Sequence, residues 1–180
     1  MLVFTVLGVK MRSFIMSLVL LASACGGAQS AGTLLHAGAE APDFMAMDQT
    51  GEVRQLRLLA RQRPVVLFFY PRDGTPGCTQ EACAFRDAWD RLEAAGAVVI
   101  GVSTDDVWSH RHFADEHDLP FPLLADPDEN VLRLYGVPTR MGMAARVTFV
   151  IDAEGRIARV FPDVDPAVHV EEVLSAIAEL

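Results

Sequence analysis

The hydrophobic pattern of this chain alternates short apolar runs with amphipathic segments. Residues Val65–Tyr70 form an unbroken run of β-branched, aliphatic and aromatic residues, which is typical of a strand buried on both faces. Similar runs at Ala97–Ser103 and Arg146–Ile151, and a shorter one at Phe121–Ala125, predict three more strands. Helices are expected from Pro76 until Gly96 ends the segment, at Asp105–Asp118, at Glu129–Tyr135 before Gly136, and from about Pro166 to Leu180.

Two hairpins complete the pattern. The turn signal Asp48–Gly51 lies within Asp43–Leu58, where Val53–Leu58 alternates in character, and this predicts a hairpin at an edge of the sheet. A second turn at Ala153–Arg156 should join the Arg146–Ile151 strand to Ile157–Phe161. Strands that alternate with helices and end in a hairpin plus a helix predict an α/β sandwich with a mixed sheet.

Length and composition fit one ordinary globular domain with a short extension. The chain has 180 residues, of which 51% are hydrophobic and 22% charged, and its net charge is −9. Its only lysine is Lys10, and no basic run is present to neutralise phosphates. These features argue against nucleic-acid binding.

The first two dozen residues are apolar, but Lys10 and Arg12 interrupt them. Each remaining run is too short for the ~20 residues that a spanning helix needs. A basic start at Met11, an apolar core and the small residues Ala22–Ala24 have the order of a signal peptide. We therefore expect a signal peptide at residues 1–24, with a possible true start at Met11.

Cys25 directly follows that predicted cleavage site. The run Leu21–Cys25 resembles a bacterial lipobox, whose cysteine is acylated after cleavage, although Ala22 stands where leucine is usual. This resemblance implies a lipid-anchored flexible tether at residues 25–37 and a domain at 38–180, on the periplasmic side of a membrane and touching it only through the anchor. Ordinary secretion after Ala24 is one alternative, and a misassigned start that leaves the protein cytoplasmic is another.

Cys78 is the strongest candidate for chemistry. The loop Pro71–Gly77 ends the central strand, and Thr75 followed by Pro76 is typical of an N-cap and first helical position. Cys78 then falls in the first helical turn, where free N–H groups and the helix dipole favour a thiolate. A single cysteine is often only a small buried hydrophobic residue. The strand-to-helix position and a second cysteine, Cys83, favour redox use here.

The spacing of Pro71, Thr75 and Cys78, P-x3-T-x2-C, resembles the active-site signature of the peroxiredoxins. Cys83, five residues after Cys78, resembles the arrangement in their bacterioferritin-comigratory or PrxQ subfamily. The similarity extends from about Gly38 to the C-terminus. It includes the segments Ala41–Phe44, Gly101–Ser103, Tyr135–Val137 and Arg146–Asp152.

This resemblance implies a thioredoxin-like fold, a central mixed sheet flanked by helices, and a thiol peroxidase that needs no cofactor or metal. Hydrogen peroxide and organic hydroperoxides would oxidise Cys78 to a sulfenic acid, and Cys83 would resolve it as an intramolecular disulfide. Thioredoxin or a similar dithiol would reduce that disulfide. By the same resemblance Thr75 would hold the thiolate and peroxide, Pro71 would exclude water, and Arg146 would supply positive charge. The protein is expected to be a monomer or weak dimer.

Several other residues have competing interpretations. Arg146 could be a surface arginine, but its position at the head of an apolar strand favours the site. Glu81 and Arg86 are further candidates for supporting roles. The spacing of His110, His112 and His117 does not place them on one helix face, so we expect solvated side chains rather than a metal site. Trp108 is expected on the inner face of its helix.

Two other functions remain open at this stage. A membrane-tethered thiol-disulfide oxidoreductase of the same fold would act on protein cysteines, but its usual C-x-x-C spacing is absent. A lipid-anchored, redox-responsive binding or chaperone protein would have no enzymatic activity. Peroxide consumption by the purified protein separates these possibilities.

Overall fold

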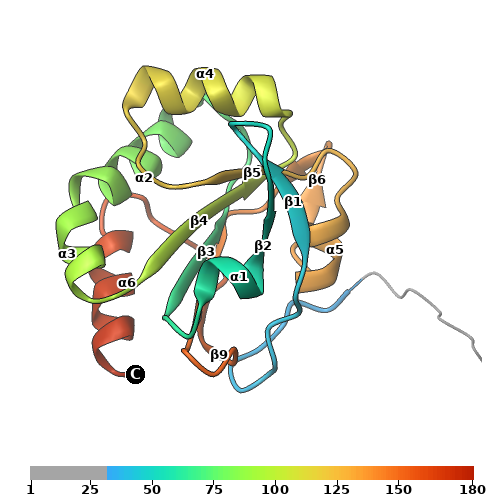
Figure 1. Cartoon of the computed structure of the whole chain (residues 1–180). Coiled ribbons are helices and arrows are strands. Elements are labelled where there is room, and N and C mark those ends of the chain that lie inside the picture. Colours follow the sequence, from blue (N-terminus) through green and yellow to red (C-terminus); the bar gives the residue numbers. More distant parts are fainter. Residues whose placement is uncertain (1–31) are drawn as a thin grey trace, which may run out of the picture.

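The computed structural model describes residues 32–180. The predicted signal peptide, Cys25 and most of the predicted tether therefore lie outside the described residues. Seven strands form one mixed sheet in the order β2-β1-β5-β4-β3-β8-β9, and β6 pairs separately with β7 (Figure 1). The strands are β1 Met45–Asp48, β2 Val53–Gln55, β3 Val65–Phe69, β4 Val98–Ser103, β5 Leu123–Ala125, β6 Thr139–Arg140, β7 Met143–Ala144, β8 Val147–Ile151 and β9 Ile157–Phe161. The helices are α1 Leu56–Ala60, α2 Pro76–Asp87, α3 Trp89–Ala94, α4 Val107–His117, α5 Asn130–Tyr135 and α6 His169–Ala178.

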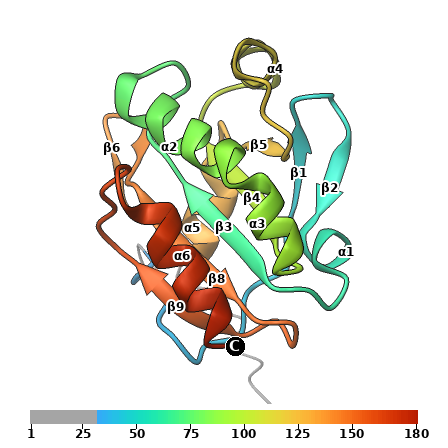
Figure 2. The same ribbon diagram turned by 90° about the vertical axis from the view of Figure 1, so that its left-hand side faces the viewer.

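Strand β3 lies near the middle of this sheet, as its sequence predicts. It runs parallel to β4 and antiparallel to β8, and all five of its residues are buried. Because side chains alternate along a strand, Val66 and Phe68 join one hydrophobic cluster while Leu67 and Phe69 join the other. Helices α2, α3 and α6 cover the first face, and α1 and α5 contribute to the second (Figures 1 and 2). The predicted mixed α/β sandwich is confirmed.

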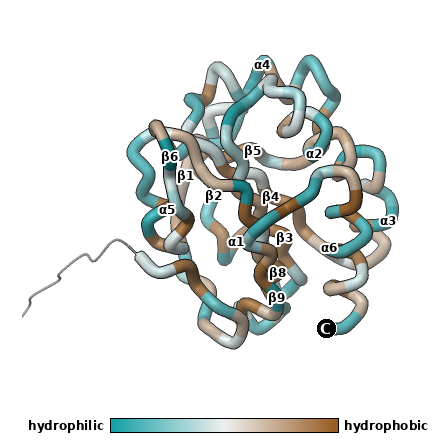
Figure 3. Tube along the Cα trace, turned by 180° about the vertical axis from the view of Figure 1, so that it is seen from behind, coloured by the Kyte–Doolittle hydropathy of each residue, from teal (hydrophilic) through white to brown (hydrophobic). Residues whose placement is uncertain are grey.

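Hydropathy follows these layers. Figure 3 shows hydrophobic residues concentrated along the central strands, with hydrophilic stretches along the surrounding helices. No helix within residues 32–180 has both the length and the apolar character needed to cross a membrane.

The structure corrects two predicted elements and adds one hairpin. The expected strand Val53–Leu58 is a three-residue strand that passes directly into α1. The single helix expected between Pro76 and Gly96 is interrupted at Ala88, which separates α2 from α3. The β6–β7 hairpin was not predicted, because two-residue strands leave no periodic signal.

The inner face of α4 also differs from the prediction. Asp106 caps this helix by accepting a hydrogen bond from the Ser109 N–H, and His110 and Phe113 lie on the buried face of the helix. His110 is fully buried, whereas Trp108 is 73% exposed and lies beneath the Arg111 guanidinium. The predictions of a solvated His110 and an inward Trp108 are therefore wrong.

Candidate functional site

The loop between β3 and α2 carries the predicted site residues. Thr75 occupies the N-cap position in an extended conformation, with φ −77° and ψ 145°, and Pro76 opens the helix. The Thr75 carbonyl accepts a hydrogen bond from the Thr79 N–H at 2.9 Å. The predicted helix start is therefore confirmed. The Thr75 hydroxyl itself donates to the Arg72 carbonyl at 3.1 Å and makes no capping bond.

Cys78 lies in the first turn of α2 and is only 2% exposed. Its Sγ accepts a hydrogen bond from Nη2 of Arg146 at 3.2 Å. Arg146 reaches this point because β8 runs antiparallel to β3, with Val147 paired to Phe69, so the start of β8 lies beside the end of β3. The structure brings both residues together, and the Arg146 side chain is only 17% exposed, so it does not lie on the surface.

Glu81 is a third member of this group. It lies one helical turn after Cys78, is 1% exposed, and accepts a hydrogen bond at Oε2 from Nη1 of Arg146. Burial raises the pKa of Glu81 to about 7, and the positive charge of Arg146 opposes that rise. The Cys78 sulfur and the Glu81 carboxylate therefore share a single guanidinium. The i, i+3 spacing of Glu81 from Cys78 was the sequence signal for this neighbour.

Cys83 lies on the same helix and is half-buried. Within residues 32–180, Cys78 and Cys83 are both free thiols on one uninterrupted helix. Arg86, three residues after Cys83, donates through Nη1 to the His117 carbonyl at 2.8 Å. This bond ties the second half of α2 to the end of α4.

Pro71 borders a cleft of about 420 Å³ that the β6–β7 hairpin also lines. Met141 and Met143 come from that hairpin, whose position is fixed in part by the Thr104 hydroxyl donating to the Gly142 carbonyl at 2.7 Å. Since Pro71 lies in the same loop as Thr75, this apolar cleft adjoins the loop that precedes Cys78.

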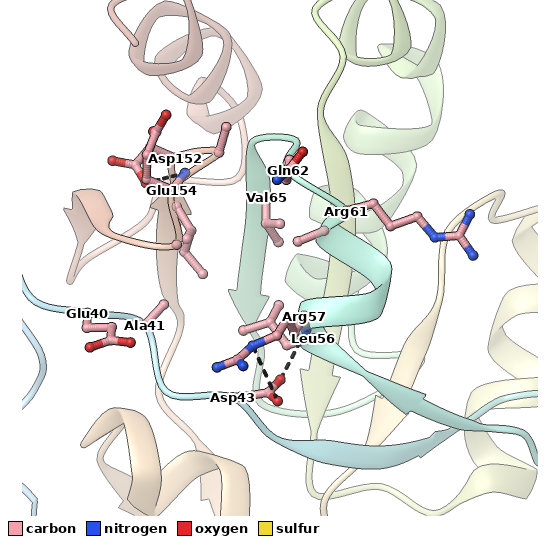
Figure 4. Close-up of a pocket in the computed structure, with 14 residues that line it drawn as sticks. Glu40, Ala41, Asp43, Leu56, Arg57, Arg61, Gln62, Val65, Asp152 and Glu154 are labelled. Atoms are coloured by element: carbon pink, nitrogen blue, oxygen red, sulfur yellow. Dashed lines mark hydrogen bonds and ion pairs between the residues drawn. The ribbon is translucent and has the colours of Figure 1, made fainter.

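Another cavity, of about 780 Å³, lies away from the thiols (Figure 4). Its lining includes Val65 at the start of β3, whereas Cys78 follows the opposite end of that strand. Arg57 and Asp43 pair across one side of it (Figure 4). Among the lining residues that the structure describes there is no cysteine, so this cavity does not form part of the site of Cys78 and Cys83.

Comparisons of the sequence and of the structure with known proteins point to the same family. Residues 37–160 match the AhpC/TSA family. A protein named peroxiredoxin bcp from Coxiella burnetii is 44% identical over 147 residues, which cover 78% of this chain and 97% of that protein. The structure resembles that of peroxidoxin BcpB from Mycobacterium tuberculosis, with a TM-score of 0.77 and 36% identity over 81% of this chain and 98% of that one.

A bacterioferritin comigratory protein from Xanthomonas campestris is a further similar structure. Its TM-score is 0.73 at 32% identity, over 79% of this chain and 98% of that chain, and its description concerns alkyl peroxide reduction. With a matching family profile, close relatives and the same mixed α/β architecture, this chain belongs to the peroxiredoxins of the AhpC/TSA family and is a thiol peroxidase with their thioredoxin-like fold.

Proposed function

We propose that the protein reduces hydrogen peroxide and organic hydroperoxides through Cys78, with Cys83 as the resolving cysteine. The observation that carries this assignment is the contact between Arg146 Nη2 and Cys78 Sγ at the start of α2. A guanidinium and free helical N–H groups both stabilise an anionic sulfur and the charge that develops on peroxide oxygens. The alkyl peroxide activity described for the Xanthomonas campestris relative supports organic hydroperoxides as substrates.

In the first step the Cys78 thiolate attacks one oxygen of the peroxide. The new S–O bond forms as the O–O bond breaks, so sulfur loses two electrons and remains as a sulfenic acid. The other oxygen leaves as hydroxide or alkoxide and takes up a proton to give water or an alcohol. Arg146 would stabilise the leaving oxygen, Thr75 would orient the peroxide through its hydroxyl, and Pro71 would limit the access of water to the sulfur.

In the second step the Cys83 thiol attacks the oxidised sulfur of Cys78. An S–S bond forms, and the sulfenic hydroxyl leaves as water with the proton of that thiol. An external dithiol such as thioredoxin then reduces the disulfide by exchange. Both cysteines return to the thiol state seen in the structure.

The burial of Cys78 favours a small substrate over a protein disulfide. Only 2% of Cys78 is exposed, so its sulfur suits a substrate as small as a peroxide, whereas a disulfide of a folded protein needs a surface thiol. The thiol-disulfide oxidoreductase is accordingly the less favoured alternative. A non-enzymatic binding or chaperone protein would not turn over peroxide.

Steady-state peroxide consumption tests the proposal. The purified protein, supplied with thioredoxin and its reductase or with dithiothreitol, should consume hydrogen peroxide and an alkyl hydroperoxide over many turnovers. Activity that persists in Cys78→Ser would overturn the assignment of the nucleophile. Disulfide exchange on a protein substrate without peroxide consumption would support the oxidoreductase instead.

We also propose that the mature protein begins at an acylated Cys25 and is held on the periplasmic side of a membrane. The lipobox-like run before Cys25 and the Gly/Ala/Ser-rich segment after it support this placement. In solution the domain would be a monomer or weak dimer, which sedimentation at several protein concentrations would test.

A further inference from the structure

A buried hydrogen-bond network surrounds the middle of the loop that precedes Cys78. Asp73 lies two residues after Pro71 and two before Thr75, and its side chain is 6% exposed. Its Oδ1 accepts a hydrogen bond from the Tyr70 hydroxyl at 2.7 Å. Its Oδ2 accepts from the Ser109 hydroxyl at 2.7 Å and lies 2.8 Å from Nδ1 of His110.

The backbone of Asp73 is held as well. Its N–H donates to Oδ2 of Asp105 at 2.9 Å, and that same oxygen accepts the Ser103 hydroxyl at 2.7 Å. Ser103 ends β4, and Ser109 and His110 belong to α4. The loop is therefore fixed at one residue to both the strand and the helix that lie next to it.

His110 is a fully buried member of this network. Burial opposes ionisation of Asp73, but the hydrogen bonds from His110, Tyr70 and Ser109 outweigh this effect, so the pKa of Asp73 is lowered. An ionised carboxylate only accepts hydrogen bonds. Nδ1 of His110 must therefore carry a hydrogen. Among residues 32–180, Nε2 of His110 has no hydrogen-bond partner. A buried histidine with one unsatisfied nitrogen costs free energy, so its presence calls for a compensating role.

Metal binding does not supply that role. Asp73, Asp105 and His110 each offer one ligand atom within 4.8 Å of the others. However, the oxygens of Asp73 and Oδ2 of Asp105 already receive hydrogen bonds from protein donors. The network is built to hold the chain rather than an ion.

We propose that Asp73 and His110 are positioning residues for peroxide reduction, which hold the loop so that Pro71 and Thr75 stand in place beside Cys78. Neither side chain has a hydrogen bond to Cys78 or Arg146, so they act through the loop. Shifting a reacting or orienting group by about 1 Å can cost on the order of 100-fold in rate. The inference builds on the proposed role of Cys78 as the nucleophile.

The test separates the peroxide step from thiolate formation. In a Cys83→Ser background, stopped-flow mixing gives the second-order rate constant of the first turnover, and the absorbance of the thiolate gives its titration. Asp73→Ala should lower the rate constant by roughly 10- to 100-fold. The thiolate titration should not move, because Arg146 and the helix start remain in place.

Substitutions of His110 and Thr75 distinguish a positioning role from a general contribution to stability. His110→Asn places an amide N–H close to where Nδ1 lies and should retain most of the rate, whereas His110→Leu should lose as much as Asp73→Ala. In a Thr75→Val background, Asp73→Ala should cost much less than it does alone, because the two residues act through the same loop.

Asp48→Ala is the matched control. Asp48 is also a buried aspartate, with four hydrogen bonds from Thr50, Glu52 and Arg54, but it lies on β1, which β5 and β4 separate from β3. This variant should lower the midpoint of thermal unfolding without changing the peroxide rate constant.

Four results would overturn the proposal: equal rates in His110→Asn and His110→Leu, additive effects of Asp73→Ala and Thr75→Val, a thiolate titration that shifts in step with the rate, or an equal rate loss in Asp48→Ala. Failure of the proposed function would be distinct. It would appear as a first turnover that survives Cys78→Ser.

Discussion

Arg146 donates a hydrogen bond to Cys78 across 68 residues of sequence, and the antiparallel pairing of β8 with β3 makes this contact possible. The same guanidinium also binds Glu81. The Cys78 sulfur therefore has a neighbouring cation, Arg146, which also contacts the acidic side chain of Glu81. Both relationships can be tested directly.

Replacing Arg146 with glutamine should make the thiolate harder to form. The thiolate should then titrate at higher pH, and the first turnover should slow far more at pH 6 than at pH 9, where thiols ionise without help. Stopped-flow rates and thiolate absorbance across that range measure both effects. Arg159→Gln, at the exposed residue of the edge strand β9, is the control. An unchanged titration would remove the electrostatic role of Arg146.

The two cysteine substitutions should differ in kind. Cys78→Ser should abolish peroxide reduction. Cys83→Ser should consume about one equivalent of peroxide and stop as the sulfenic acid, unless an external thiol resolves it. Intact mass spectrometry with a dimedone-type trap detects that product. Equal loss of the first turnover in both variants would contradict the assigned roles.

Glu81 should make the stability of the reduced protein depend on pH. Burial raises the pKa of Glu81 from the ordinary 4.5 to about 7. The folded state then binds its proton more tightly than the unfolded chain does. The resulting stabilisation is complete below about pH 4.5 and is lost as the pH rises through about 7.

Glu81→Gln should remove that dependence, which is on the order of 3 kcal/mol at most. Urea unfolding of the reduced protein at pH 5 and at pH 7.5 gives the change in the free energy of unfolding between the two pH values for each variant. Glu93→Gln, an exposed position on α3, should leave it unchanged. A pH dependence that survives in Glu81→Gln would assign it to another group.

Disulfide formation should unwind the start of α2. Two residues five apart on an ideal helix have Cα atoms roughly 8.6 Å apart, whereas a disulfide tolerates at most about 7 Å. Oxidation should therefore expose amides from about Cys78 to Phe85 to hydrogen exchange. Mass spectrometry of the reduced and oxidised protein measures this. Equal protection in a sample proven to contain the disulfide would show that the helix bends without unfolding.

Cys25→Ala should release the protein from membranes. Expressed with its own N-terminus, the unchanged protein should sediment with the membrane fraction, because an acyl chain contributes about 0.8 kcal/mol per buried methylene. The variant should be recovered in the soluble fraction. A mature species that begins at an unmodified Cys25 would instead indicate ordinary signal cleavage.

Local signals in the sequence predicted much of the site. The apolar run of β3 and the Thr75–Pro76 pair are both contiguous, so the central strand and the helix start could be located without knowledge of the fold. Arg146 required the resemblance, because only sheet pairing brings the start of β8 to Cys78.

Contacts between distant segments of the chain explain why the sequence did not predict the burial of His110. The burial of His110 depends on Asp73, 37 residues away, and helix periodicity alone cannot choose between it and the larger, more hydrophobic Trp108. The break between α2 and α3 was missed as well, because alanine stands at position 88 rather than the glycine or proline that would have predicted a break.

That break at Ala88 would limit how far the predicted unwinding of α2 spreads through the fold. Trp89, the first residue of α3, packs near Phe121 with ring centroids 6.1 Å apart and can stay in place while α2 unwinds. Every turnover would then include a miniature folding reaction confined to α2, over about Cys78 to Phe85. Short helices form in roughly a microsecond. Re-forming the helix in the reduced protein would therefore be much faster than a typical enzymatic turnover, so this step would not limit the rate.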